Sequence, residues 1–149
     1  HFYFRCDGNI GIAKRGNDCG VLYTRETITD EWVEKFDLIP KMRHADVQLD
    51  GDILSVFYTR AEDLVEHIRV CVINVNTWDV MNDYELMRPV EKWEGAEVPE
   101  VPSKFGGVWN RVNQLRDPYL FIDDDGKRYL FYSYAGESGI AYVELKMMV

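Results

Sequence analysis

The sequence has few cysteines, no long apolar run and no signal-peptide layout. Its three cysteines, Cys6, Cys19 and Cys71, are odd in number and lack C-x-x-C spacing, which argues against a disulfide framework and against a zinc site. Cys6 and Cys71 lie in apolar segments, so we expect small buried side chains in a reducing compartment. Because no apolar run approaches the length of a transmembrane helix, we expect a soluble protein.

A surplus of basic charge is also missing. The 149 residues include 26 acidic and 17 basic side chains, which gives a net charge of −9 without a cluster of Lys and Arg. Nucleic acids and anionic membrane surfaces both attract basic patches, so we expect neither as a partner. The acidic run 123–125 lacks the spaced ligands of a calcium loop and is predicted to be a solvated turn. We expect no metal and no cofactor.

Aromatic residues and short β-forming segments are abundant. Aromatics make up 13% of the chain, which suits either a β-rich core or the stacking of flat rings on sugars. Apolar runs of about five to eight residues, separated by turns such as Asp-Gly, predict an all-β fold. Residues 60–67 fit either a short helix or a long loop. The expected strands lie near 2–6, 10–14, 21–24, 33–38, 46–49, 53–59, 67–74, 84–89, 119–122, 128–134 and 139–145.

One pattern occurs twice at the same spacing. Phe4 is followed seven residues later by Gly-Ile-Ala at 11–13, and Tyr132 is followed seven residues later by Gly-Ile-Ala at 139–141. A looser copy spans 53–72. Self-similarity at a period of roughly 40–75 residues, built from sheet-forming segments, predicts a β-propeller. The loops and strand ends of a propeller surround a central channel, where polar residues of different blades converge.

The repeats divide a single domain, 1–149, into blades of four-stranded antiparallel sheet. The expected blades are 1–41, with strands two to four only, the complete 42–90, and 115–149, with strands one to three; 91–114 is a long loop. A propeller closes with about four or more blades, so about two and a half to three blades do not close one. The chain also begins inside an expected strand. We therefore expect a fragment of a longer protein, or a homo-oligomer that pairs the open blade edges.

The segment 115–133 carries a resemblance to a known family. It reads Leu-Arg-Asp-Pro, then a short apolar strand, an Asp-Gly turn at 125–126 and an aromatic strand. This resembles the C-terminal part of the five-bladed β-propeller glycoside hydrolases of the family 43 and family 32 type, and the resemblance is weaker over 1–60. It implies a central cavity lined by carboxylates from the first strands of successive blades. One carboxylate acts as base or nucleophile, a protonated one as acid, and a third tunes the acid.

Three carboxylates are candidates for these catalytic roles. Asp117, in the Arg-Asp-Pro motif, matches best and would be the base or the acid-tuning group; a turn cap before Pro118 is the alternative. Asp46 holds a comparable position in the second blade but lacks the following proline. Glu137 follows the second strand of the third blade, where it is either the acid or part of a solvated hairpin.

Four further residues are candidates for substrate binding. Arg116 and His44 each precede a candidate acid and are suited to bind hydroxyls or a carboxylate, although a histidine is also a common structural hydrogen-bonding group. Trp109 and Arg111 lie in the long loop. Trp109 is either a platform for stacking on sugars or a buried anchor of that loop.

Taken with the resemblance, these residues predict a glycoside hydrolase-like propeller that acts on a plant or algal poly- or oligosaccharide. The chain would form the C-terminal part of a longer enzyme. The alternative is a non-catalytic propeller fragment whose aromatic loop, 105–111, binds carbohydrate or a protein partner. A third interpretation is a truncated fragment that has no activity of its own and persists by self-association.

Overall fold

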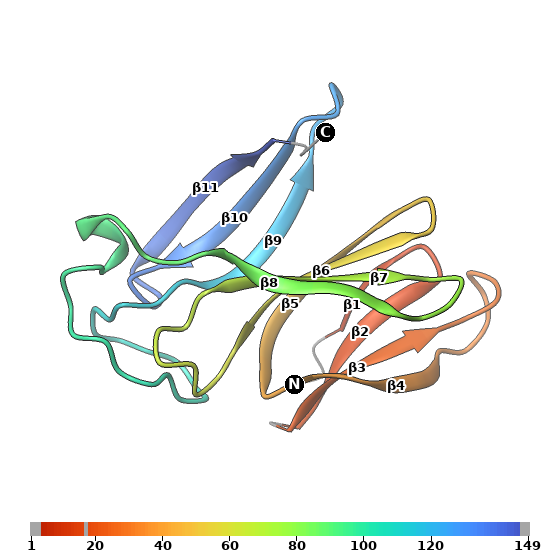
Figure 1. Ribbon diagram of the computed structural model, residues 1–149, viewed down its shortest axis with the longest axis horizontal. Helices are drawn as coiled ribbons and strands as arrows, with labels where there is room; N and C mark the ends of the chain where they lie inside the picture. Colours follow the sequence, from red (N-terminus) through yellow and green to blue (C-terminus); the bar gives the residue numbers. More distant parts are fainter. Residues whose placement is uncertain (1–3, 17, 147–149) are drawn as a thin grey trace.

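The computed structural model describes residues 4–16 and 18–146, which form an all-β fold of three antiparallel sheets (Figure 1). The first sheet contains β1 (Phe4–Asp7), β2 (Ile10–Arg15), β3 (Cys19–Thr24) and β4 (Val33–Pro40). The second contains β5 (Met42–Asp50), β6 (Ile53–Arg60), β7 (Ile68–Asn74) and β8 (Val80–Met87). The third contains β9 (Arg116–Ile122), β10 (Arg128–Tyr134) and β11 (Gly139–Leu145).

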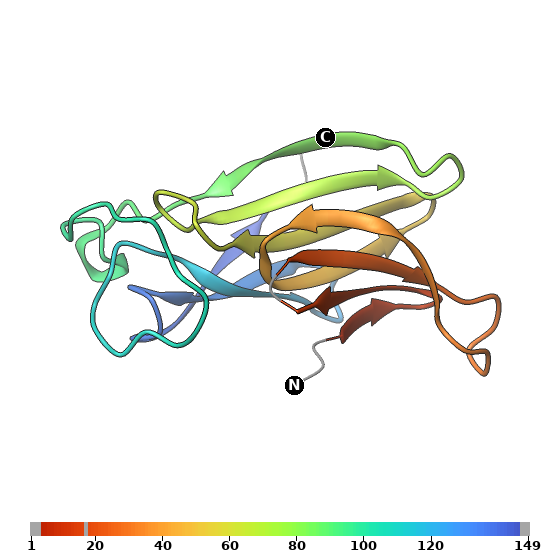
Figure 2. The ribbon, with the colours of Figure 1, turned by 90° about the horizontal axis from the view of Figure 1, so that it is seen from below.

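The first strand of each sheet lies at the centre of the fold. β1 contacts β5, and β5 contacts β9, so three inner strands follow one another as they do in successive propeller blades. Figures 1 and 2 place the long connection 88–115 at one end of the molecule and the turn between β3 and β4 at the other. The prediction of an all-β fold built from partial propeller blades is confirmed.

Some local expectations are wrong. The first sheet has four strands rather than three, because β1 already pairs with β2 as an inner strand. The expected strand at 2–6 is described from Phe4 onward, and residues 2 and 3 lie outside the described residues. Of the two alternatives for 60–67 the loop is correct, because residues 61–67 form turns and bends. β5 and β9 begin earlier than the apolar patterns indicate. Within the described residues, one 3₁₀ turn, η1 (Lys92–Glu94), is the only helical element.

The apolar core has two parts because the second sheet is buried on both faces. Side chains alternate along β6, so Val56 packs in the cluster against the first sheet and Phe57 in the cluster against the third. Cys71 belongs to the first of these clusters, whereas Cys6 is exposed, so the interpretation of Cys6 as a buried residue is wrong. No described helix has the length and hydropathy needed to cross a bilayer.

Carboxylates tie the inner strands together. Asp7 of β1 accepts a hydrogen bond of 2.7 Å from the backbone N–H of Leu49 in β5. Asp46 of β5 accepts one of 2.7 Å from the backbone N–H of Leu120 in β9. The first and second sheets therefore each satisfy a backbone donor of the sheet that follows, which holds successive inner strands together.

The repeated Gly-Ile-Ala pattern marks equivalent hairpins rather than equivalent blade positions. Phe4 pairs with Ala13 across β1 and β2, and Tyr132 pairs with Ala141 across β10 and β11. The first hairpin joins strands one and two of its sheet, whereas the second joins strands two and three. The spacing therefore reports a common hairpin register, and it overstates the similarity of the two blades.

Candidate functional site

Two arginines on neighbouring inner strands frame the candidate site. Arg43 of β5 and Arg116 of β9 each lie beside an irregularity in strand pairing, and both side chains are buried. Their guanidinium groups converge on the fully buried Glu66, with Arg43 Nε 3.0 Å from Oε1 and Arg116 Nε 3.5 Å from Oε2. Burial raises the pKa of Glu66 against the opposing effect of both arginines. These buried charges hold the starts of β5 and β9 together.

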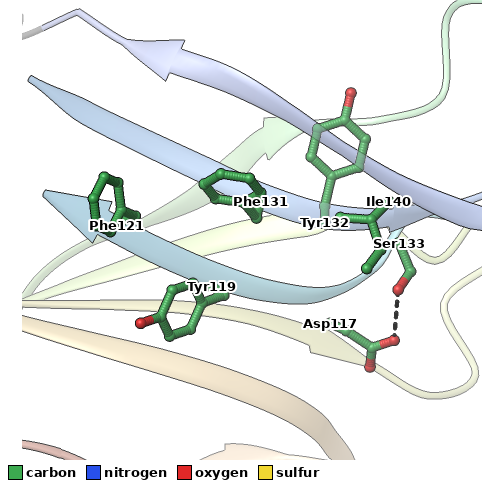
Figure 3. Close-up of a pocket in the computed structure, with 7 residues that line it drawn as sticks. All are labelled: Asp117, Tyr119, Phe121, Phe131, Tyr132, Ser133 and Ile140. Carbon is green, nitrogen blue, oxygen red and sulfur yellow. Dashed lines mark hydrogen bonds between the residues drawn. The ribbon is translucent and has the colours of Figure 1, made fainter. Parts of the chain in front are cut away.

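Asp117 follows Arg116 in a constrained conformation. Its φ of 51° lies in the left-handed region, which is uncommon for a residue with a side chain, and Pro118 follows it. One carboxylate oxygen is hydrogen-bonded to Nδ1 of His44, and the other accepts a 2.9 Å bond from Ser133 Oγ (Figure 3). Burial acts to raise the pKa of Asp117, but His44, the bond from Ser133 and the charge of Arg43 together outweigh it, so the pKa is lowered. Asp117 is therefore held as a carboxylate.

The structural counterpart of Asp117 in the second sheet is His44 rather than Asp46. When Arg43 is matched with Arg116, His44 falls on Asp117 and Asp46 falls on Tyr119. The match is supported by strand pairing, because Asp46 pairs with a phenylalanine of β6 just as Tyr119 pairs with a phenylalanine of β10. The two equivalent positions, His44 and Asp117, are bonded to one another.

Asp46 is engaged by the backbone. Its Oδ2 accepts from Leu120 N at 2.7 Å, its Oδ1 accepts from Val47 N at 3.0 Å, and the residue is 8% exposed. Burial raises its pKa, although the two backbone donors act in the opposite direction. Asp46 and Asp117 line different cavities, so the structure does not bring these two candidates into one pocket.

Glu137 lines a polar cavity of about 650 Å³, in the turn between β10 and β11. Its Oε1 accepts a 3.0 Å hydrogen bond from Arg116 Nη1 and lies 4.0 Å from Arg43 Nη2. We call this space the polar cavity; it is lined by Lys14, Arg43, His44, Phe105, Gly106, Gly107 and Glu137. A smaller cavity of about 190 Å³, which contains Asp117, shares His44 with it. His44, which is bonded to Asp117, therefore lines the same cavity as Glu137.

Trp109 stands at the edge of the polar cavity. Its side chain is 94% exposed, so the alternative of a buried loop anchor is wrong. A Cβ placed on Gly107 would lie 3.6 Å from the Trp109 ring and 3.5 Å from Glu137 Oε2, so both side chains flank this glycine. Arg43 holds the part of the long connection that precedes Trp109, because it donates to the carbonyls of Lys104 at 2.5 Å and Gly106 at 3.0 Å. A flat, exposed indole is therefore presented beside a carboxylate.

Arg111 lies outside the polar cavity. Its guanidinium bonds Glu97 Oε1 at 2.8 and 3.0 Å, and it also donates to the carbonyls of Lys92 and Trp93. These bonds attach the loop that carries Trp109 to η1. The structure therefore gives Arg111 a role in holding the loop.

A third hollow, of about 490 Å³, lies on the outer face of the third sheet (Figure 3). Asp117 and Ser133 form one end of it, and Phe121 lies at the other. The lining between them is apolar, with the rings of Tyr119 and Phe131 from adjacent strands. Asp117 thus sits at the boundary between the inner cavities and this apolar face.

Three functional candidates were missed by the sequence analysis. Lys14 lines the polar cavity from β2, Glu66 receives both buried arginines, and Ser133 bonds Asp117. Ser133 had a detectable signal, because an antiparallel hairpin at 125–126 places it opposite the Arg-Asp-Pro motif. Glu66 and Lys14 had no such signal in the sequence, because the residues near them in space come from other sheets and loops. Among the described residues, no group of three or more His, Cys, Asp and Glu side chains is arranged to hold a metal ion.

The comparisons agree with this architecture. No family model matches the chain. It is 43% identical over 109 residues to an uncharacterized protein of Acanthamoeba polyphaga mimivirus, a match that covers 70% of this chain and 30% of the relative. It resembles the crystal structure of a thermostable family-43 glycoside hydrolase with a TM-score of 0.55 and 13% identity, over 92% of this chain and 44% of that chain. The chain therefore has a glycosidase-like fold and spans less than half of either protein.

Proposed function

We propose that this chain is part of a glycoside hydrolase-like propeller, the C-terminal part of a longer enzyme, that binds and cleaves a poly- or oligosaccharide. The observation that carries the proposal is the exposed Trp109 ring beside Glu137 at the edge of the polar cavity. Aromatic rings stack on the apolar faces of sugars, and a pocket of several hundred Å³ with a few polar groups is the usual form of a small-ligand site.

Asp117 is the best candidate for the ionised carboxylate of the reaction. Its lowered pKa and its bonds to His44 and Ser133 suit a base, a nucleophile or a group that stabilises positive charge on the sugar. Glu137 is the accessible carboxyl group of the polar cavity and the candidate proton donor. Asp46 has the raised pKa expected of an acid, but its two backbone bonds and burial leave it a positioning role.

The proposal is tested by hydrolysis of a panel of plant and algal oligosaccharides, with Asp117→Asn as the decisive variant. The substitution keeps the shape and removes the charge, so we expect turnover to fall by about 100-fold or more. Asp123→Asn, in an exposed turn, is the matched control and should leave turnover unchanged. Equal turnover of Asp117→Asn and the unaltered protein would remove Asp117 from the mechanism.

A non-catalytic carbohydrate-binding domain is the second candidate function. It is favoured by one observation: all three candidate carboxylates already have partners, with Asp46 on backbone donors, Asp117 on His44 and Ser133, and Glu137 on Arg116. Quenching of tryptophan fluorescence by an oligosaccharide, with loss of the effect in Trp109→Ala and no release of product, would favour this function over hydrolysis.

A further inference from the structure

Lys14 is a cation that lines the polar cavity of an acidic protein. Among the described residues no carboxylate forms an ion pair with its ammonium group, although the chain carries a net charge of −9. The ammonium lies over the ring of Phe105, 4.6 Å from the centroid, which directs it into the polar cavity. Burial and the neighbouring charge of Arg43 lower the pKa of Lys14, as expected for a cation placed beside another cation.

We propose that the polar cavity binds a sugar that carries an anionic group, a carboxylate or a sulfate, through Lys14 with Arg43 and His44 beside it. The idea rests on the proposed function only in taking the ligand to be a carbohydrate. Of the charged groups that line the cavity, Lys14 and Arg43 are positive, and Glu137 is the one carboxylate among the described lining residues. Glu137 is bonded to Arg116, so Lys14 is left as the cation that an incoming anion would neutralise.

The arrangement also explains how such a sugar would be oriented. Arg43 is 4% exposed and is bonded to the loop carbonyls, so it contributes positive charge from the wall of the cavity. Trp109 stands beside Glu137, and Lys14 reaches the same cavity from β2. A sugar ring stacked on the indole would lie beside Gly107 and Glu137, at the edge of the cavity that Lys14 enters. Anions are favoured here over neutral groups because the cavity walls screen charge less than water does.

The test is binding to a microarray of matched neutral, uronate-containing and sulfated plant and algal oligosaccharides. We expect the uronate or sulfated glycans to bind at least about tenfold better than their neutral counterparts, with affinity that falls as salt increases. Lys14→Gln should abolish this preference, and Trp109→Ala should weaken all binding. Lys127→Gln removes an equal charge from an exposed turn and should change nothing. Comparison of the uronate-containing glycans with the sulfated ones identifies which anionic group is bound.

The outcomes separate this inference from the proposed function. Equal binding of neutral and anionic glycans, or a preference that survives Lys14→Gln, would overturn the anionic subsite and leave a carbohydrate-binding propeller. Binding to no glycan would overturn both. A thermal melt of Lys14→Gln that matches the unaltered protein shows that any loss arises in the cavity.

A separate observation concerns the outer face of the third sheet. By strand register, Phe131 and Tyr142 of this sheet occupy the positions of Phe57 and Val70 in the second sheet. In the second sheet these positions are buried against the third. In the third sheet the same face is open, with Tyr142 63% exposed and Ile140 75% exposed. The third sheet therefore repeats a sheet-packing surface, and no described residue of the chain covers it.

We infer that this face packs against the same face of a second copy of the chain, about a two-fold axis. The first sheet offers no matching surface, because Ala13 and Val21, on its side away from the second sheet, are already buried. Self-association through one open face gives an isologous dimer. The open face is formed by only three strands and ends at the polar side chains of Asp117 and Ser133, so the dimer should be weak.

Sedimentation velocity between about 1 and 100 μM tests this contact. We expect reversible dimerisation in the unaltered protein and a monomer for Tyr142→Lys. Met81→Lys, at a residue of β8 that is 59% exposed, is the matched control and should still dimerise. A monomer at all concentrations, or a dimer that persists in Tyr142→Lys, would overturn the inference.

Discussion

Asp46 and Asp117 lie on neighbouring inner strands, and their surroundings act on them in opposite ways. Asp46 is 8% exposed and bonds two backbone donors, and burial raises its pKa. The Asp117 side chain is 34% exposed and bonds His44 and Ser133, and its pKa is lowered. The difference shows that an inner-strand carboxylate has its pKa raised where burial dominates, and lowered where a histidine, a hydroxyl and a nearby arginine outweigh burial.

The largest effect expected from this comparison is on stability. Asp46→Ala leaves the buried N–H groups of Val47 and Leu120 without acceptors, so it should lower the free energy of unfolding by about 3 kcal/mol. Asp117→Ala should cost only about 1 kcal/mol, because water can reach the partners of a one-third exposed side chain. Urea unfolding of the two variants measures these free energies. Equal losses of stability would contradict the view that Asp46 supports the backbone more than Asp117 does.

A second effect is a split in titration. Carboxyl NMR should place the pKa of Asp46 above 3.8 and that of Asp117 below 3.8. Since the folded pKa of Asp117 is depressed, its stabilising contribution is present above the unfolded pKa and is lost as pH falls through the folded one. For Asp46 the sign is reversed, and stability falls as pH rises through its raised folded pKa. Equal pKa values for Asp46 and Asp117 would contradict this prediction.

The smallest effect expected is a change in the pKa of Asp117 when its partner is removed. His44→Gln takes away the charge and the hydrogen bond that oppose burial, so the pKa of Asp117 should rise toward or above its ordinary value. His67→Gln, at a histidine bonded to the carbonyl of Val65, is the control and should leave Asp117 unchanged. An unshifted pKa of Asp117 in His44→Gln would mean that Ser133 and Arg43, rather than His44, oppose burial.

The sequence was informative where the signal was local. The Arg-Asp-Pro motif and the hairpin after it located Asp117, because turn residues and alternating apolar residues specify such a unit directly. Asp46 was assigned a catalytic role that its position does not support, since its bond to Leu120 depends on how β5 meets a strand 74 residues away. Glu66 could not be identified at all, because its significance comes from two arginines on different strands.

The carboxylates that join the inner strands also bear on how the chain unfolds. Asp7 satisfies Leu49 in the second sheet, and Asp46 satisfies Leu120 in the third, so the second and third sheets each take an acceptor from the sheet before them. Opening one sheet would leave an orphaned backbone donor in the next one. Stacked repeats often come apart unit by unit, but we expect these two bonds to couple the unfolding of neighbouring sheets in this chain.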